Sequence, residues 1–415
     1  MSSTPNGIVT TAVAAFILFG CGQEPGSESD AVIVDSAGIR IVTNTSPTWT
    51  DATAWRLSGT PQLVIGSVEG DPSTQLFHVV GGVILEDGRI AIANAGTHEL
   101  RYFGADGRHL HTTGREGAGP GEFRSIGWLQ RFSEDSLAVW DWNKRELSIF
   151  DATGRFARSF RLEGVGGTAP SPLGVWGDGR ILAEYRPRGP VTYGRSRPTE
   201  TLVVYAPDGT GGDSIGTYHA REEYVRRMHV WGRDMNMWLP VPFGRSAALV
   251  VSHDHLYLGA REGYEIGVYT PQGALQSIVR LDRLPRPITD DDLQAELGRL
   301  TSFADDEDAR RVLAELREAE IPETMPAFGK HGADSNRNSR SLRVDTGGNL
   351  WVLEYAAPDD SATQWSVFDP TGVYLGTMPF PDQVVPLDIG DDYVLAHWRD
   401  ELDVEYVGRY QLIKP

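Results

Sequence analysis

The residues best suited to binding a ligand are arginines and tryptophans grouped between Tyr224 and Trp238 and continuing to Arg245. Arginine side chains pair with carboxylates or phosphates, and indole faces suit sugars or cations. The stretch stands out because the chain as a whole has a formal net charge of −19. We therefore predict a site for a partner protein or a small anionic or glycan ligand. Its candidate residues are Arg226, Arg227, Trp231, Arg233, Trp238 and Arg245.

A second explanation of this stretch needs no ligand. In it, Trp231 and Trp238 pack the stretch onto the rest of the fold, and the arginines pair with the excess carboxylates of the chain. Replacing three arginines by alanine separates the explanations, because only a binding site would then lose affinity for its partner. The three are Arg226, Arg227 and Arg233.

One pattern resembles a hydrolase nucleophile but lies in the wrong context. Residues Gly212–Gly216 read Gly-Asp-Ser-Ile-Gly, which matches the G-x-S-x-G pattern. That pattern is functional where a strand enters a sharp turn and a helix leaves it. Here it follows a turn at Gly209 and is expected to form a strand with no helix after it. We therefore predict no catalytic residue.

Two other patterns could hold a metal. His253–His255 places two imidazoles at an expected hairpin turn, but a third ligand would have to come from His219 or His229. The acidic runs Asp290–Asp292 and Asp305–Asp308 lack the glycine-centred spacing of a calcium loop. The motifs therefore predict no metal site and no cofactor, although carboxylates from distant segments could still hold a divalent metal such as calcium.

The composition limits the partners. A net charge of −19 and an isoelectric point near 4.9 repel polyanions, so nucleic acid is not an expected partner. The single cysteine, Cys21, excludes an intramolecular disulfide and a cysteine-rich metal site.

The N-terminus has the pattern of an export signal. Ile8 to Phe19 is almost wholly apolar and has the length of a signal-peptide core rather than of a membrane span. It ends in Leu18-Phe19-Gly20-Cys21, which resembles a bacterial lipobox, whose cysteine is diacylated. We predict a signal peptide over residues 1–20, a tether and N-terminal segment over 21–37, and lipidation at Cys21. The alternative is a lone cysteine in an ordinary signal peptide.

The rest of the chain must position these residues, and it repeats one β unit. The unit is clearest from Val79 to Phe123, where four β-prone runs are separated by Asp87-Gly88, Gly96 and Asp106-Gly107. Asp-Gly pairs between such runs predict antiparallel hairpins, because both residues tolerate the positive φ of tight turns. The runs are Val79–Leu85, Arg89–Asn94, Glu99–Phe103 and His109–Thr113.

The unit recurs, at intervals of roughly 45 residues in the first copies, as expected of propeller blades, and at longer intervals later because of insertions. Its marker is an aromatic residue followed four positions later by glycine, at Phe103–Gly107, Phe150–Gly154, Tyr205–Gly209, Tyr269–Gly273 and Phe368–Gly372. A sixth copy, from Val384 to Gln411, has three strands and no fourth. The orphan strand Gln62–Ile65 supplies the missing one, which closes a ring and removes its free edges.

The predicted fold class is all-β: a six-bladed β-propeller over residues 38–415, with four-stranded antiparallel blades and the N-terminal strand closing the last blade. Seven blades is the alternative, if residues 31–57 form more than a flap. Insertions are expected at 186–200, 218–245 and 282–340. The last is a small helical insertion, with helices from Thr289 to Leu297 and from Asp305 to Glu320.

The pattern resembles six-bladed propellers of the NHL-repeat-like type, particularly bacterial lipoproteins. The resemblance rests on the glycine-rich segment Gly117–Phe123, on Asp87–Asn94 and on the aromatic-to-glycine turns. It implies a central channel lined by the first strand of each blade, with ligands or partners met on one face. It transfers no site residue. Lactonase-like propellers hold a divalent metal with carboxylate and asparagine ligands.

These observations predict a lipid-anchored, non-catalytic protein of the bacterial cell envelope, on the periplasmic or outer-membrane face, or secreted if it is not lipidated. Its expected partner is an envelope protein or a small ligand, and its oligomeric state stays open. The competing prediction is a metal-dependent lactonase-like hydrolase or a lyase that works in the propeller channel.

Overall fold

The computed structural model describes residues 31–133, 136–230, 233–252, 254–301, 306–329, 341–355, 363–381 and 383–415. Cys21, Trp231 and His253 lie outside these residues. Within them the structure is mostly strands, and no helix there is long and apolar enough to cross a membrane.

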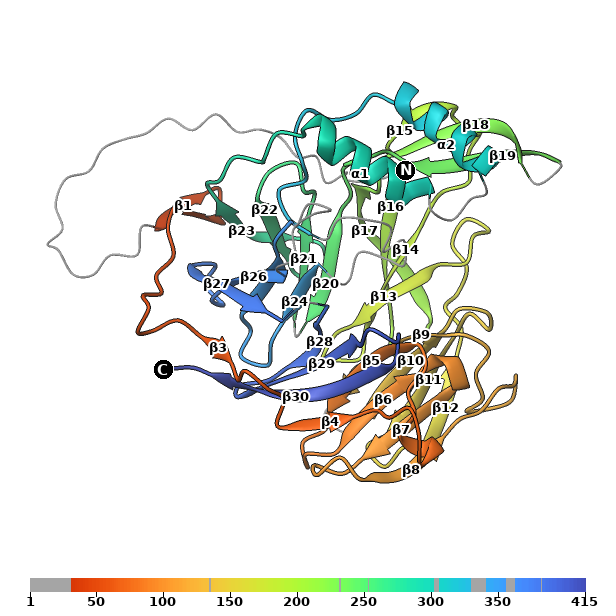
Figure 1. Ribbon diagram of the computed structural model, residues 1–415, viewed down its shortest axis with the longest axis vertical. Coiled ribbons are helices and arrows are strands. Elements are labelled where there is room, and N and C mark those ends of the chain that lie inside the picture. The colour runs from red at the N-terminus through yellow and green to blue at the C-terminus, as the bar shows by residue number, and fades with distance from the viewer. Residues whose placement is uncertain are drawn as a thin grey trace, which may run out of the picture.

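Most strands belong to four-stranded antiparallel sheets that follow one another along the chain (Figure 1). The first three are β5(Val79–Ile84)–β6(Ile90–Asn94)–β7(Glu99–Phe103)–β8(His109–Thr113), β9(Ile126–Ser133)–β10(Ser136–Asp141)–β11(Glu146–Asp151)–β12(Phe156–Phe160), and β13(Ser171–Val175)–β14(Ile181–Tyr185)–β16(Thr199–Tyr205)–β17(Gly211–His219). The next two contain β20(Ala248–Ser252), β21(His255–Gly259), β22(Glu265–Tyr269) and β23(Leu275–Leu281), and then β24(Leu342–Val344), β25(Leu350–Leu353), β26(Thr363–Phe368) and β27(Tyr374–Phe380). The last contains β28(Val385–Ile389), β29(Tyr393–Arg399) and β30(Glu405–Ile413).

The repeated turns are built as the sequence predicts. At the five aromatic-to-glycine turns the glycine has a positive φ, between 79° at Gly107 and 88° at Gly372. Only a residue without a Cβ adopts this backbone freely. The second strand of the first sheet, Ile90–Asn94, is buried at every position because a neighbouring sheet covers each face.

The sheets form a propeller. The first strand of each sheet lies innermost, and β5 contacts both β9 and β28, which belong to the second and the last sheets along the chain. β13 contacts β9 and β20, and β20 contacts β24. The all-β propeller class is therefore confirmed.

The closing strand is also where the sequence predicts it. β4(Leu63–Ile65) pairs antiparallel with Val407–Arg409 of β30, and β3(Arg56–Leu57) pairs with the end of β30. The two ends of the chain thus share one sheet.

An N-terminal hairpin extends another sheet. β1(Ala31–Ser36) pairs with β2(Ile39–Asn44), and β2 pairs in parallel with β23. The buried Asn44 fixes this attachment, because its amide donates to the carbonyls of Arg280 and Gly372 and accepts from the N–H of Tyr374.

Segments of the three insertions assemble into one unit, which we call the cap. It contains the sheet β15(Gly194–Ser196)–β18(Glu223–Val230)–β19(Arg233–Pro240) and the helices α1(Asp290–Thr301) and α2(Asp306–Glu318) (Figure 1). A shared apolar core joins them, formed by Met228, Leu239, Leu297, Leu300, Val312 and Leu316. α1 runs past the predicted end at Leu297 because Leu300 is buried in this core.

The cap lies on the face of the ring where the first strands begin. In a sheet of consecutive antiparallel strands, the connection from strand two to three and the one leaving strand four lie at the same end. The cap sheet and helices come from the connections β14–β16, β17–β20 and β23–β24, which are all of these kinds.

Candidate functional site

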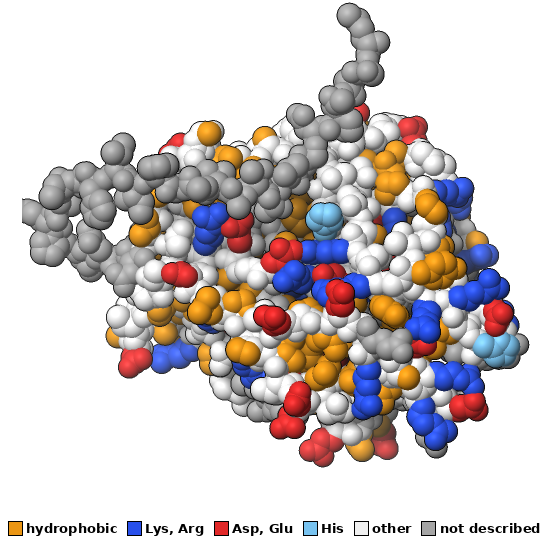
Figure 2. Space-filling model, turned by 90° about the horizontal axis from the view of Figure 1, so that it is seen from above, with side chains coloured by type: hydrophobic (Ala, Val, Ile, Leu, Met, Phe, Trp, Pro, Cys, Tyr) orange, Lys and Arg blue, Asp and Glu red, His pale blue; other side chains and the backbone are white. Residues whose placement is uncertain are grey.

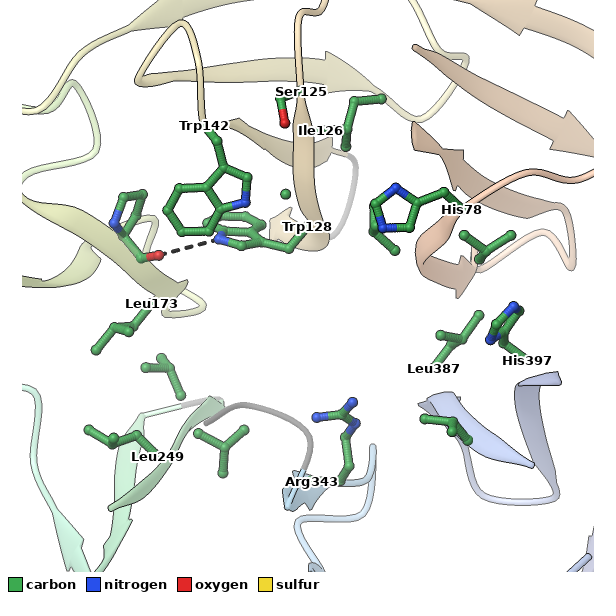
Figure 3. Close-up of a pocket in the computed structure, with 17 residues that line it drawn as sticks. His78, Ser125, Ile126, Trp128, Trp142, Leu173, Leu249, Arg343, Leu387 and His397 are labelled. Carbon is green, nitrogen blue, oxygen red and sulfur yellow. Dashed lines mark hydrogen bonds between the residues drawn. The ribbon is translucent and has the colours of Figure 1, made fainter. Parts of the chain in front are cut away.

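A cavity of about 180 Å³ lies inside the ring, lined by residues from the first strands of all the propeller sheets (Figure 3). Its lining includes Val79 of β5, Ile126 of β9, Leu173 of β13, Leu249 of β20 and Leu387 of β28. Most of these positions are near the starts of their strands, so the cavity lies toward the same face as the cap.

Two tryptophans form one wall of the cavity. Trp128 of β9 donates its indole N–H to the carbonyl of Pro172 at 3.3 Å, and Trp142 follows the second strand of the same sheet. Trp142 lies directly over Gly127, where a Cβ atom would be only 2.3 Å from the indole Nε1. The absence of a side chain at Gly127 is therefore what allows the Trp142 ring to take this position.

Cationic and titratable groups form other parts of the lining. Arg343 of β24 points into the cavity, and His78 and His397 lie on the side opposite the leucines of β13 and β20 (Figure 3). Arg343 donates Nη1–H to the carbonyl of Leu342 at 3.1 Å. His78 has a φ of +54°, an uncommon backbone conformation for a residue with a side chain.

The buried carboxylate of Glu405 lies next to His397. Glu405 is 4% exposed, and its Oε2 accepts the N–H of Val79 at 2.6 Å and lies 3.4 Å from His397 Nε2. Its Oε1 accepts from Arg399 at 2.5 Å. Burial works to raise the pKa of Glu405, but the nearby His397 imidazole, the hydrogen bond from the N–H of Val79 and the charge of Arg399 together lower it to about 2. The carboxylate is thus held ionised against the imidazole.

The opposite end of the channel is bridged by an ion pair. Arg131 Nη1 and Nη2 lie 2.9 and 2.7 Å from the two carboxylate oxygens of Asp388, and Nη2 also donates to the carbonyl of Ile84. The three residues are at the far ends of β9, β28 and β5. This bridge ties three first strands together.

The residues predicted to bind a ligand do not share one surface. Cross-strand pairing places Arg226 opposite Met237, and Val225 opposite Trp238, so Arg226 and Trp238 point to opposite faces of the cap sheet. Arg226 pairs with Glu315 of α2 at 2.6 Å, as the packing explanation requires. Trp238 is 48% exposed on the other face.

The remaining predicted residues are spread along the hairpin. Arg227 Nη2 is 3.9 Å from Asp234 Oδ2 on the Trp238 face, and Arg233 is exposed at the start of β19. The backbone N–H of Arg245 donates to Glu222 at the base of the cap. Lys and Arg side chains, with hydrophobic ones among them, gather on this side of the molecule (Figure 2). A binding role for the stretch stays a prediction.

The other sequence patterns have structural roles in the described residues. Gly212–Gly216 lies within β17, as expected, and no helix follows it. His255 bonds to Gln276, while His229 bonds to Asp234 in the cap. The described parts of the chain contain no group of three His, Cys, Asp or Glu side chains that could hold a metal.

Sequence reasoning did not identify the cavity residues. The resemblance implied a channel lined by first strands, and polar or aromatic residues near the starts of these strands were the available signal. Trp128 and Arg343 fit this signal. Trp142 follows a second strand and His397 lies within one, so only the three-dimensional structure shows that they line the cavity.

No protein-family model and no curated protein matches the sequence. Among solved structures, a member of the DUF4221 family from Bacteroides vulgatus has a TM-score of 0.50 and 8% identity, covering 87% of this chain and 99% of that chain. A protein from Bacteroides fragilis described as exported has a TM-score of 0.48 and 14% identity, with coverages of 90% and 99%. A gluconolactonase from Xanthomonas campestris has 0.40 and 14%, with coverages of 82% and 87%. At these identities the likeness concerns the fold alone.

Proposed function

We propose that this protein binds a small ligand in the central cavity, without catalysis of its own. The observation that supports the proposal is the lining: an indole wall from Trp128 and Trp142 faces a set of polar groups formed by Arg343, His78 and His397. A concave, mostly apolar site with a few converging polar groups is the usual form of a small-molecule site.

The setting of this function follows the sequence predictions. The protein is a six-bladed, NHL-repeat-like lipoprotein of the bacterial cell envelope, exported by its signal peptide and anchored through Cys21. The cap face carrying Arg227 and Trp238 is the place where an envelope protein would meet it.

Affinity selection with mass spectrometry tests the proposal. A mixture of small metabolites is incubated with the wild-type protein, with the double variant Trp128→Ala/Arg343→Gln, and with Arg108→Gln as a control. Arg108 is an exposed residue in the β7–β8 turn. We expect compounds that the wild type and the control retain and the cavity variant loses. Equal retention by a folded cavity variant would rule out this site.

A hydrolase or lyase acting in the channel is the second candidate. The observation that favours it is His397, which lines the cavity with the ionised Glu405 behind it, an arrangement suited to accepting a proton. Asp and Glu are absent from the described part of the cavity lining, so these residues do not provide the oxygen-rich cage that calcium prefers.

Metal analysis and an activity assay separate the two candidates. An enzyme of the lactonase-like kind would retain stoichiometric calcium or zinc after dialysis and would hydrolyse gluconolactone, with loss of turnover in His397→Gln. The binding function instead predicts gluconolactone hydrolysis no faster than in the His397→Gln variant.

A further inference from the structure

The described part of the cavity lining carries a positively charged side chain. Among the residues that the structure describes, its side chains include a guanidinium, from Arg343, and two imidazoles, from His78 and His397, but no carboxylate. The protein as a whole carries a formal net charge of −19. The Arg343 guanidinium thus places a positive charge at the cavity wall of a chain that is acidic as a whole.

The Glu405 carboxylate lies close to this lining, and its charge is balanced by groups outside the cavity. Glu405 is 4% exposed and accepts hydrogen bonds from the N–H of Val79 and from Arg399. Its charge is therefore already balanced by donors outside the cavity. It orients His397 without turning a negative charge toward a ligand.

The volume of the cavity and its apolar wall indicate the size and the uncharged part of the ligand. Cavities of about 150 Å³ hold one benzene molecule, and this cavity has about 180 Å³. Trp128 and Trp142 offer flat faces against which a ring can stack, and Ile126, Leu173 and Leu249 add aliphatic contacts.

From this lining we propose that the ligand is a small monocarboxylate with a single ring, aromatic or alicyclic. The ring contacts Trp128 and Trp142, and the carboxylate faces Arg343. This inference rests on the proposed function, since it names the chemical class bound by the same cavity. Arg343 selects the charge, because a carboxylate forms an ion pair with the guanidinium, whereas an amide of the same shape is neutral and accepts only a weaker hydrogen bond from it.

Matched pairs of probes test the inference. Benzoate and cyclohexanecarboxylate are titrated into the full-length protein by isothermal calorimetry, each beside its carboxamide. We expect at least one carboxylate to bind at least tenfold more tightly than its amide, which is about 1.4 kcal/mol. Arg343→Gln should abolish this preference, Arg343→Lys should keep part of it, and Arg108→Gln should leave it unchanged.

The outcomes distinguish this inference from the function it rests on. If an amide binds as tightly as its acid, or if Arg343→Gln keeps the preference, the charge selection is wrong while binding in the cavity stands. If no acid or amide binds at millimolar concentration, the inference is refuted. Should the metabolite selection also yield no compound dependent on Trp128 and Arg343, the proposed function fails with it. Melting temperatures close to that of the wild type show that the variants are folded.

Discussion

Glu405 illustrates at the scale of one residue how the fold holds a charge beside the cavity. Folding lowers its pKa from an ordinary value of 4.5 to about 2, so the native state favours the ionised form. The stabilisation is fully present above about pH 4.5 and is lost as the pH falls toward about 2. Its size is on the order of 3 kcal/mol.

We expect Glu405→Gln to flatten the pH dependence of stability. Urea unfolding at about pH 6 and about pH 3 should show a smaller loss of unfolding free energy on acidification than in the wild type, by on the order of 2 kcal/mol. Glu69→Gln, at an exposed position, is the control and should follow the wild type. Parallel curves for Glu405→Gln and the wild type would contradict the account.

Gly127 provides a test of the indole wall. Alanine there would place its Cβ 2.3 Å from Trp142 Nε1, so the ring must move, while an ordinary strand backbone accepts the methyl group. We expect Gly127→Ala to weaken ligand binding at least tenfold, which is about 1.4 kcal/mol, measured by the same calorimetric titration. Gly177→Ala, with nothing within 4 Å of the added atom, is the control. Unchanged affinity in Gly127→Ala would show that Trp142 does not contact the ligand.

At the scale of elements, the cap separates the two explanations of the arginine-rich hairpin. Arg226 faces α2 and pairs with Glu315, whereas Arg227 and Trp238 face away from the helices. The packing explanation therefore accounts for Arg226. The binding explanation is confined to the other face of β18 and β19.

In-cell cross-linking tests that remaining prediction. We expect an envelope protein that cross-links to the wild type to be lost from the folded triple variant Arg226→Ala/Arg227→Ala/Arg233→Ala. The single variant Arg226→Ala should keep the partner and lose no more than about 1 kcal/mol of stability, as for an exposed ion pair. Full retention of the partner by the triple variant would leave the hairpin with a structural role only.

At the scale of the whole molecule, the ring depends on a strand from the other end of the chain. Ile65 is 3% exposed and packs between the first and last sheets, whereas its neighbour Val64 is 46% exposed. We expect Ile65→Ala to cost about 2–4 kcal/mol, as for a buried aliphatic residue, and to speed proteolytic release of the N-terminal segment. Val64→Ala should change stability by less than about 0.5 kcal/mol. Equal effects at both positions would contradict closure through β4.

The sequence predicts features that depend on local or repeated signals, but not features that depend on contacts between distant segments. Turn glycines such as Gly107 and Gly372 and the orphan strand at Ile65 are local or repeated signals, so the propeller and its closure were predictable. The cap was not, because Met228 belongs to one insertion and Leu297 and Leu316 to another, and these residues meet only after folding. The cavity was missed for the same reason, since Trp142, Arg343 and His397 come from three different sheets and form no motif.

A crystal structure of the protein soaked with the compound that the wild type retains best is the most direct test of binding in the channel. The account predicts ligand density in the cavity, with contacts to Trp128, Trp142 and Arg343. Density on the outer face of β18 and β19, with only water in the cavity, would contradict it.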